Sequence, residues 1–191
     1  MILWNHRWEY DKNPEEFFRA LYQLLDEGMA FKVAILGEAY RKVPPVFFEA
    51  QQRLGERIVQ FGFAEDFADY ARWLWRADIV PVTSVHDFFG VSVVQAIYCG
   101  CTPLLPRRLA YPEHLPTTWH DGFLYDDPSE LPTRLSALLT HRRQAPGELR
   151  SHVARYDWSE LVGRYDEFFE DLGLKRQERK YRGGKRAHLD R

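Results

Sequence analysis

The chain has 191 residues, 45% of them hydrophobic, and its 26 Lys and Arg nearly balance its 28 Asp and Glu. A chain of this length and composition can bury a sizeable core, which excludes a disordered protein or a coiled coil. No run approaches the roughly 18 apolar residues of a membrane helix, and no secretion signal is visible, so we expect a cytoplasmic protein without a membrane partner.

Strand and helix patterns alternate along the first third of the chain. Residues 1–6 form a short apolar run, and an asparagine at position 13, followed by a proline and two glutamates, predicts a helix that ends near residue 28. A β-rich run over residues 31–36 predicts the next strand. A helix after the proline pair at 44–45 ends near residue 55, and residues 57–61 form a third strand.

The alternation continues to residue 105. An apolar stripe predicts a helix around residues 67–75, followed by a buried strand over residues 78–83. A loop at residues 86–90 opens directly into a helix over residues 91–98, and a strand over residues 101–105 follows. The remaining elements are a short strand at residues 123–125 and helices over residues 129–141, 147–156 and 157–172.

The order of these elements predicts an α/β fold, a Rossmann-like parallel sheet with helices on both faces. Residues 1–172 make up this domain, and helices form its C-terminal part. Pro81 conflicts with the strand in which it lies, because proline has no N–H to donate to a sheet ladder. It therefore predicts that this strand is at the edge of the sheet or is distorted there.

The last residues differ from the body in charge. Residues 175–191 hold eight basic and two acidic residues, a net charge of +6, which leaves −8 for the rest of the chain. Because apolar residues become sparse after residue 172, we expect a basic, flexible tail over residues 173–191. Such a tail either binds nucleic acid or is a solvated end, and the solvated end is the more common case.

A diphosphate site is predicted at one edge of the sheet. Ligands of an open parallel sheet bind beyond the carboxyl ends of its strands, where loops meet helix N-termini. A helix N-terminus offers an anion unpaired N–H groups and a positive dipole, and Arg and Lys add cationic donors. The residues that the sequence places there are Arg7, Lys12, Gly37, Phe89, Gly90 and Val91.

Three polar side chains on the same loop and helix are candidates for recognising the rest of the ligand. Asp87 precedes the turn and Gln95 lies eight residues further on, so both can exchange hydrogen bonds with hydroxyl groups. Each has an alternative role, Asp87 as an N-cap and Gln95 as an exposed helix residue. His86 is weaker evidence, because a lone histidine is more often structural and no metal ligands lie at suitable spacing.

The other notable residues are assigned to structure. The aromatic residues are expected in the core and at interfaces rather than on a base-stacking surface, and the two cysteines are expected to be reduced and structural. The sequence has no Gly-x-Gly-x-x-Gly motif after the first strand and no Walker loop, which counts against a nicotinamide dehydrogenase or a nucleoside triphosphatase. The aromatic residues in question are Trp4, Trp8, Tyr10, Trp73 and Trp75, and the two cysteines are Cys99 and Cys101.

Three stretches resemble a known family. HDFFGVSVVQAIYCGCTP at residues 86–103 resembles the signature of retaining family 4 glycosyltransferases of the GT-B fold, with an acid, a Phe-Gly pair and a second acid eight positions after the first. WNHRWEYDKNPEEFF at residues 4–18 and YPEHLP at residues 111–116 are similar to the subgroup that includes tRNA-queuosine α-mannosyltransferase. The resemblance covers nearly all of residues 1–172.

The resemblance implies a role for each matching residue. Asp87 matches the acid that contacts the donor sugar, while Arg7 and Lys12 match the cations that hold the donor diphosphate. Gln95 falls where a glutamate usually binds the ribose. This departure implies a weaker grip on the ribose, because a neutral amide replaces a carboxylate that accepts from two hydroxyl groups.

The resemblance also implies only one half of a two-domain enzyme, because GT-B enzymes bind their acceptor mainly in an N-terminal domain. We therefore expect a nucleotide-sugar donor as substrate, GDP-mannose in the narrower resemblance, with no cofactor and no required metal. Queuosine in tRNA is the candidate acceptor, and a missing N-terminal domain or a partner chain would bind it. The alternative is a non-catalytic nucleic-acid-binding or assembly module that uses the basic tail.

Overall fold

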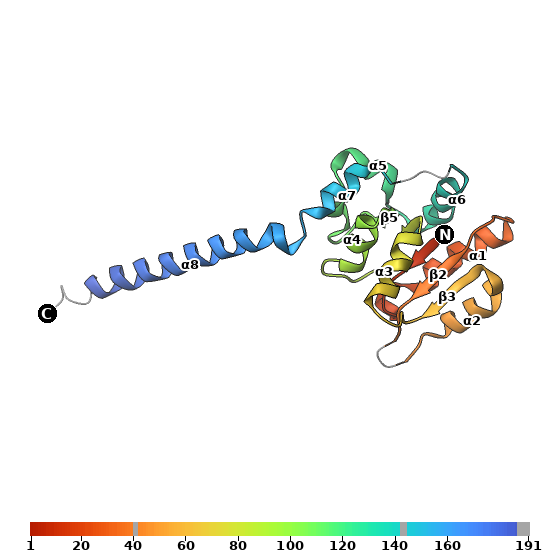
Figure 1. Ribbon diagram of the computed structural model, residues 1–191, viewed down its shortest axis with the longest axis horizontal. Helices are drawn as coiled ribbons and strands as arrows, with labels where there is room; N and C mark the ends of the chain where they lie inside the picture. Colours follow the sequence, from red (N-terminus) through yellow and green to blue (C-terminus); the bar gives the residue numbers. More distant parts are fainter. Residues whose placement is uncertain (40–41, 142–144, 187–191) are drawn as a thin grey trace. The chain divides into compact units, whose positions relative to one another are not determined.

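The computed structural model describes residues 1–39, 42–141 and 145–186, and of residues 174–186 it describes the helical backbone. The chain divides into two compact units, Met1–Val153 and Ala154–Arg191 (Figure 1). The first unit holds the sheet, and the second is mainly one long helix. In the part of the chain that the structure describes, no helix is both long and apolar enough to cross a membrane.

The first unit is built on a six-stranded sheet whose paired strands are all parallel. The spatial order β3-β2-β1-β4-β5-β6 is that of a Rossmann fold, in which the direction of strand addition reverses between β1 and β4. The predicted α/β class is therefore confirmed. The strands are β1 (Ile2–Trp4), β2 (Val33–Leu36), β3 (Ile58–Gly62), β4 (Ile79–Pro81), β5 (Thr102–Pro106) and β6 (Leu124–Tyr125).

The helices cover both faces of the sheet. α1 contacts α2 and α6, whereas α3 contacts α4. Because crossover connections between parallel strands are right-handed, the reversal at β1 and β4 sends the helices of the two halves to opposite faces. The helices of this unit are α1 (Pro14–Asp26), α2 (Pro45–Leu54), α3 (Phe67–Arg76), α4 (Val91–Tyr98), α5 (His120–Phe123), α6 (Leu131–His141) and α7 (Gly147–Ala154).

Aromatic residues from three elements fill the core under α1 and α2. The Trp4 ring lies 4.9 Å from that of Phe17 and 5.8 Å from that of Phe47, and Trp8 stacks on Phe47 at 4.4 Å. Trp4 and Trp8 are buried, as predicted. Tyr10 and Trp75 are more than half exposed, so these two aromatic residues lie outside the core, and an interface role for them stays a prediction. Trp75 instead packs against the Arg150 guanidinium on α7, 5.2 Å from its ring centre.

Pro81 lies in an interior strand, so the edge position predicted as one option was wrong. β4 pairs with β1 only at Ile79, and its pairing with β5 continues through Pro81. The Ile79 N–H donates to the carbonyl of Met1, just before β1, and the Val82 N–H donates to the Leu104 carbonyl on β5. Because donor direction alternates along a strand, the missing N–H of Pro81 faces β1 where that ladder has already ended. The other predicted option was a distorted strand, and the early end of the hydrogen-bond ladder between β4 and β1 is such a distortion.

The cysteines are free, as expected. Cys101 is fully buried, and its thiol donates to the carbonyls of Leu74 and Ala77. Burial raises the pKa of the Cys101 thiol to about 12, so it stays protonated at neutral pH. A structural role fits this environment.

The second unit contains α8 (Trp158–Arg186), which is longer than predicted. The sequence predicted a helix end near residue 172 and a tail from residue 173, whereas the helix continues to residue 186. Lysine, arginine, glutamate and glutamine are good helix formers, and they outweigh the two glycines at 183–184. The end of the predicted tail, residues 187–191, lies outside the described residues.

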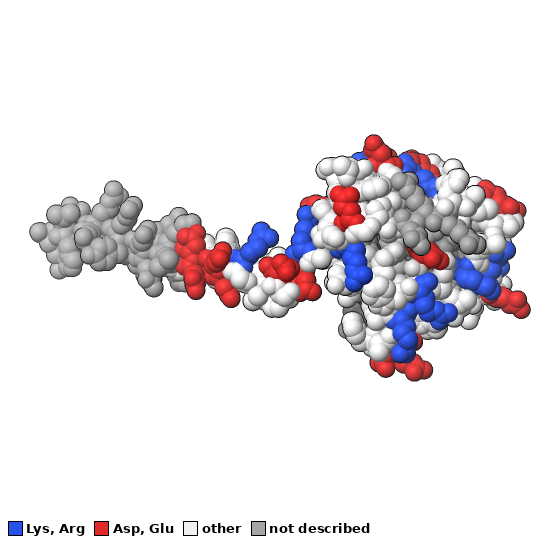
Figure 2. All heavy atoms as spheres, turned by 45° about the horizontal axis from the view of Figure 1, so that its top comes forward, with Lys and Arg blue, Asp and Glu red and all other residues white. Residues whose placement is uncertain are grey.

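Charged side chains are mixed on the surface that Figure 2 shows. Lys and Arg side chains alternate there with Asp and Glu, with no broad area of one sign on that face. Surface ion pairs of the first unit include Arg53 with Asp26 at 3.0 Å and Arg107 with Asp126 at 3.0 Å. A surface of this kind gives little attraction for a polyanion beyond local sites.

Candidate functional site

The carboxyl ends of β1 and β4 lie where the strand order reverses, and the loops that follow these strands are bound to each other. The Thr83 hydroxyl donates to the Lys12 carbonyl at 2.8 Å, and the Val85 N–H donates to the Asp11 carbonyl at 2.9 Å. Ligands of doubly wound sheets bind in the crevice at this switch point. The fold therefore brings together the two loops on which the sequence placed its main candidates.

Lys12 is the centre of this site. Its side chain is 9% exposed, and its ammonium lies 2.8 Å from the His86 carbonyl, 3.2 Å from Asp87 Oδ2 and 3.1 Å from Asp11 Oδ2. The Lys12 ammonium donates hydrogen bonds to the His86 carbonyl and to Asp87, and its contact with Asp11 is an ion pair. The structure confirms that Lys12 and Asp87 meet, and it adds a second carboxylate, Asp11, that the sequence analysis missed.

Asp87 is an ionised, hydrogen-bonded carboxylate. Oδ2 accepts from the Lys12 ammonium and, at 3.2 Å, from the Tyr111 hydroxyl. Burial alone would raise its pKa, but the Lys12 charge and these two hydrogen bonds outweigh burial and hold the pKa of Asp87 below its usual value. At neutral pH it can therefore accept hydrogen bonds from a ligand's hydroxyl groups.

Arg7 supplies the free cation. It follows β1 on the same loop as Lys12, and its side chain is exposed. Its guanidinium makes no hydrogen bond or ion pair with any residue that the structure describes. Lys12 is held by two hydrogen bonds and an ion pair inside the site, whereas the side-chain donors of Arg7 meet no described residue and are available to an anion.

The loop before α4 is held in a tight turn by the segment Tyr111–His114, a 3-10 helix. Gly90 has φ +85°, and a Cβ there would lie 3.0 Å from the Tyr111 ring. The His114 imidazole, fully buried, lies 2.6 Å from the Phe89 carbonyl. The Val93 N–H in the first turn of α4 donates to the Gly90 carbonyl at 3.0 Å, whereas the Val91 N–H donates to no residue that the structure describes and stays available to an anion.

The sequence analysis quoted this YPEH segment only as part of a resemblance and gave it no role. Tyr111 and His114 lie more than twenty residues from the turn that they hold in place. A tyrosine and a histidine in a short proline-containing segment carry no signal by themselves. Only the folded chain shows that the two side chains grip the loop.

Gly37 has a structural explanation of its own. Its φ is +111°, and a Cβ would clash with the backbone carbonyl of His6. The close approach joins the loop after β2 to the loop after β1, and the Trp8 N–H donates to the Glu38 carbonyl at 2.9 Å. A role of Gly37 in ligand binding stays a prediction.

His86 contributes its backbone rather than its side chain to the Lys12 site. Its carbonyl accepts from Lys12, while its exposed ring packs edge-on against Phe88 at 5.1 Å. Phe88 itself is 91% exposed. A catalytic role of the His86 imidazole stays a prediction without support from its contacts.

His6 is a buried histidine that the sequence analysis did not single out. It lies between Trp4 and Ser92, and its Nδ1 is 3.2 Å from the Ser92 hydroxyl in the first turn of α4. Burial, followed by the Lys12 charge, lowers the pKa of His6 to about 4. Its imidazole is therefore neutral at pH 7, and it links β1 to the α4 N-terminus.

Gln95 lies on α4, one turn beyond its N-terminus, and is partly buried. Its amide oxygen accepts from the Tyr70 hydroxyl of α3 at 3.0 Å. The amide is thus fixed by a partner on another helix, which the sequence analysis did not predict.

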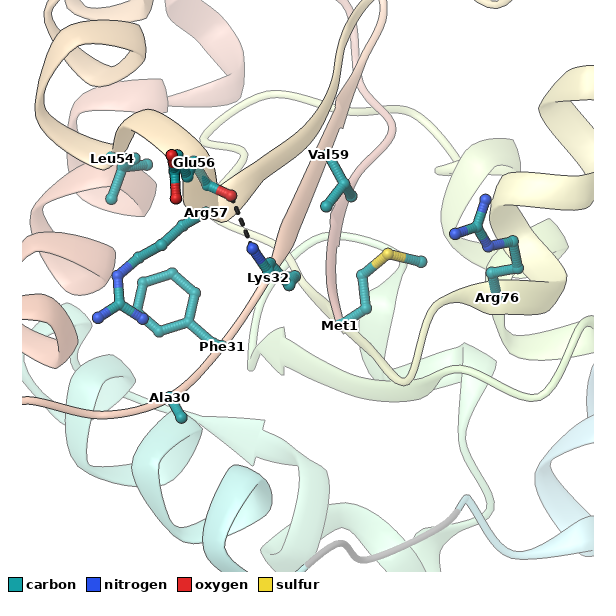
Figure 3. A pocket seen from close by; sticks show the side chains of 9 residues that line it. All are labelled: Met1, Ala30, Phe31, Lys32, Leu54, Glu56, Arg57, Val59 and Arg76. Atoms are coloured by element: carbon teal, nitrogen blue, oxygen red, sulfur yellow. Dashed lines mark hydrogen bonds between the residues drawn. The ribbon is translucent and has the colours of Figure 1, made fainter.

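A hollow of about 830 Å³ lies at the opposite, amino end of the sheet (Figure 3). Residues before β1, β2 and β3 line it, among them Met1, Phe31 and Lys32, whose ammonium donates to the Glu56 carbonyl at 2.8 Å. None of the predicted site residues lines it. Because loops and helix N-termini converge at the carboxyl end of a parallel sheet, we place the candidate site there.

Among the residues that the structure describes, no group of three or more His, Cys, Asp or Glu could hold a metal ion. The two carboxylates at the site, Asp11 and Asp87, both lie against the Lys12 ammonium, at 3.1 Å and 3.2 Å. That the reaction requires no metal stays a prediction.

Three comparisons bear on the family. Residues 1–141 match the model of the family described as "Glycosyl transferases group 1". The chain is 44% identical over 115 residues to a tRNA-queuosine alpha-mannosyltransferase of Drosophila melanogaster, a match that covers 60% of this chain and 30% of the relative. It is 25% identical over 185 residues to a GDP-mannose:cellobiosyl-diphosphopolyprenol alpha-mannosyltransferase of Xanthomonas oryzae pv. oryzae, covering 92% and 48%.

The fold has close structural relatives. The crystal structure of HepE from Anabaena in complex with UDP-glucose superposes with a TM-score of 0.69 at 18% identity, over 89% of this chain and 48% of that one. This likeness places the first unit among the Rossmann-like domains of GT-B glycosyltransferases, as predicted. The chain spans between about a third and a half of the length of the relatives it matches.

Proposed function

Because the chain belongs to the family of group 1 glycosyl transferases, we propose that its first unit binds a nucleotide-diphosphate sugar at the carboxyl ends of β1 and β4. The observation that carries the proposal is the meeting of Lys12 and Asp87, 3.2 Å apart, beside the free N-terminus of α4. A cation, an ionised carboxylate and unpaired N–H groups in one crevice suit a ligand that combines a diphosphate with a hydroxylated sugar.

In the proposed complex each group acts on a different part of the donor. The Arg7 guanidinium and the N–H groups at Gly90 and Val91 hold the diphosphate, which gains negative charge as the glycosidic bond breaks. Lys12 adds its positive charge and keeps Asp87 in place. Asp87 accepts hydrogen bonds from hydroxyl groups of the sugar, and transfer proceeds with retention at the anomeric carbon.

GDP-mannose is the favoured donor. Two relatives are mannosyltransferases by name, and the name of one states GDP-mannose as its donor. HepE, whose complex contains UDP-glucose, supports only the coarser class of nucleotide sugars. The 44% identical relative supports queuosine in tRNA as the acceptor. An acceptor domain would be supplied by further sequence or by a partner chain, and the protein would act in the cytoplasm without a membrane partner.

Calorimetric titration of the chain with GDP, GDP-mannose and UDP tests the proposal. We expect GDP and GDP-mannose to bind, and Arg7→Ala or Lys12→Ala to weaken binding by roughly ten- to hundredfold, the range for lost charge-assisted hydrogen bonds. Arg53→Ala is the matched control, because it removes an exposed cation that pairs with Asp26 at the C-terminal ends of α2 and α1, away from the loops that follow β1 and β4. If no nucleotide binds, or if the site variants bind as well as the control, the proposal is wrong.

The second candidate function is a nucleic-acid-binding or assembly module, and the observation that favours it is the net charge of +6 in residues 175–191. A tRNA gel shift across salt concentrations separates the two functions. Removal of residues 175–191 should weaken tRNA binding and lower its salt dependence, whereas Asp87→Ala should leave it unchanged. Unchanged tRNA binding without the tail contradicts this candidate and leaves the donor site untouched.

A further inference from the structure

A chain of hydrogen bonds joins β1, α4 and α3 behind the site, and its direction is set by a backbone carbonyl. Asn5, at the end of β1, is 7% exposed, and its Nδ2 lies 2.8 Å from the Ser92 carbonyl. A carbonyl oxygen can only accept. Asn5 must therefore present its NH2 group on this side, since the flipped amide would bring two acceptors together.

The next hydrogen bond in the chain joins Asn5, as donor, to Tyr70. The Asn5 NH2 group also lies within 3.4 Å of the Tyr70 hydroxyl oxygen. Burial raises the pKa of the Tyr70 phenol, so the hydroxyl keeps its proton at neutral pH. In the part of the chain that the structure describes, the acceptor for this proton is Gln95 Oε1, at 3.0 Å.

The last step fixes the amide of Gln95. If the Gln95 amide were flipped, its NH2 group would face the Tyr70 hydroxyl. The partly buried hydroxyl would then lose the acceptor of its proton, at the free-energy cost of an unpaired buried polar group. The amide oxygen therefore points at Tyr70 and the NH2 group points away from it. This NH2 group donates to no residue that the structure describes.

We propose that Tyr70 is a positioning residue that turns the Gln95 amide so that its NH2 group donates hydrogen bonds to the ribose oxygens of the bound nucleotide. The proposal rests on the proposed donor-binding function, with the ribose beside Gln95 as the family resemblance implies, and goes beyond it in the direction of the hydrogen bond and in the role of Tyr70. A glutamate at this position would accept hydrogen bonds from the ribose, whereas Gln95 donates them. The ribose hydroxyl groups therefore act as acceptors toward Gln95.

A methyl ether of the ribose distinguishes these two directions, because it keeps the acceptor oxygen and lacks the donor hydrogen. The probes are GDP and its 2′-O-methyl and 3′-O-methyl derivatives, titrated against the full chain and against Gln95→Glu. The bulk of the methyl group is common to both proteins, so the ratio of the two Kd values isolates the hydrogen-bond direction. We expect ratios below about three for the parent and roughly tenfold or more for Gln95→Glu.

Tyr70→Phe tests the positioning role. Without the hydroxyl, the Gln95 amide can rotate, so the preference for GDP over 2′,3′-dideoxy-GDP should fall from about tenfold toward one, and it should fall no further in a Tyr70→Phe/Gln95→Leu double variant. A merely structural role would weaken both nucleotides equally. Tyr98→Phe is the control. Tyr98 lies on α4, the helix that carries Gln95, is exposed, and makes no hydrogen bond through its hydroxyl with the described residues.

The outcomes separate this inference from the proposed function. Equal methyl-ether ratios for the parent and Gln95→Glu, or an unchanged ribose preference in Tyr70→Phe, overturn the inference while GDP still binds and Lys12→Ala still weakens it. If the parent binds neither GDP nor UDP, the proposed function fails and this inference fails with it.

Discussion

At the residue scale, the site is defined by which polar groups are already paired. Lys12 donates to Asp87 and the His86 carbonyl and forms an ion pair with Asp11, while Arg7 uses none of its side-chain donors within the described structure. Arg7 and Lys12, which the sequence analysis assigned to the same diphosphate, therefore differ in the donors that they can offer a ligand. Arg7 is ready to bind an anion directly, and Lys12 organises the carboxylate that would meet the sugar.

The buried His6 makes the stability of the chain depend on pH. The unfolded chain protonates this imidazole below about pH 6.5, and the folded protein does so only below about pH 4. Between these values the unfolded state binds more protons, so stability falls as the pH is lowered, by roughly 3 kcal/mol in total from His6.

His6→Asn keeps a polar group near Ser92 but cannot titrate in this range. Urea unfolding between pH 4 and 7 should therefore show a flatter stability profile for His6→Asn than for the parent. The exposed His141→Asn is the control, and its profile should follow that of the parent. An equal slope in His6→Asn and the parent would contradict the assignment.

At the element scale, the turn before α4 is held by side chains from a distant segment. Tyr111 closes over Gly90 and donates to Asp87, and His114 lies against the Phe89 carbonyl. These contacts from a distant segment therefore fix the conformation of the turn at which α4 begins. By contrast, Asn13 is the N-cap of α1 in position only, because its φ of +52° is left-handed and its side chain makes no cap hydrogen bond.

Gly90→Ala and Gly100→Ala separate two costs of adding a side chain at Gly90, the strain of a positive φ and the contact with Tyr111. Both residues have positive φ, which costs an alanine about 1–2 kcal/mol, but a Cβ at Gly100 meets nothing within 4 Å. Gly90→Ala should therefore destabilise the protein by about 1 kcal/mol more than Gly100→Ala, because it also presses on the Tyr111 ring. It alone should weaken GDP binding. Equal unfolding free energies and equal Kd values for the two variants would show that Tyr111 does not confine the turn.

At the scale of the whole molecule, the chain consists of a complete sheet unit and a separate helical unit. The buried residues Leu149 and Val153 on α7 belong to the first unit, which therefore keeps its core to its last residue. α8 exposes a row of apolar side chains at helical spacing, in which the Tyr165 ring lies 5.7 Å from that of Trp158 and 6.3 Å from that of Phe169.

A chain that ends at Val153 should accordingly fold by itself. We expect one cooperative thermal transition and a Tm within about 4 °C of the full chain, since a loss of about 1 kcal/mol shifts a domain of this size by that amount or less. Differential scanning calorimetry measures both. A broad transition, or a Tm far below that of the full chain, would show that Ala154–Arg191 supplies part of the core.

The sequence by itself determined the alternation of strands and helices, and with it the parallel sheet, whereas the edge that it predicts for a ligand stays a prediction. Hydrophobic periodicity and turn residues are local signals, so the predicted bounds of α1, α4 and most strands agree with the structure. The same local signals misplaced the end of α8, because helix-forming residues continue past residue 172. They also left the position of Pro81 open, since which strands lie next to one another is not a local property.

Only the tertiary structure decided which of the candidate residues meet and in what state. Lys12 and Asp87 are 75 residues apart in the chain, and Tyr70 and Gln95 are 25 apart. The pairing of Lys12, the ionisation of Asp87, the neutrality of His6 and the orientation of Gln95 all depend on burial and on partners from other elements. Burial and distant partners are properties of the packed chain, because hydrogen bonds and charges act over a few ångströms in space whatever the separation in sequence.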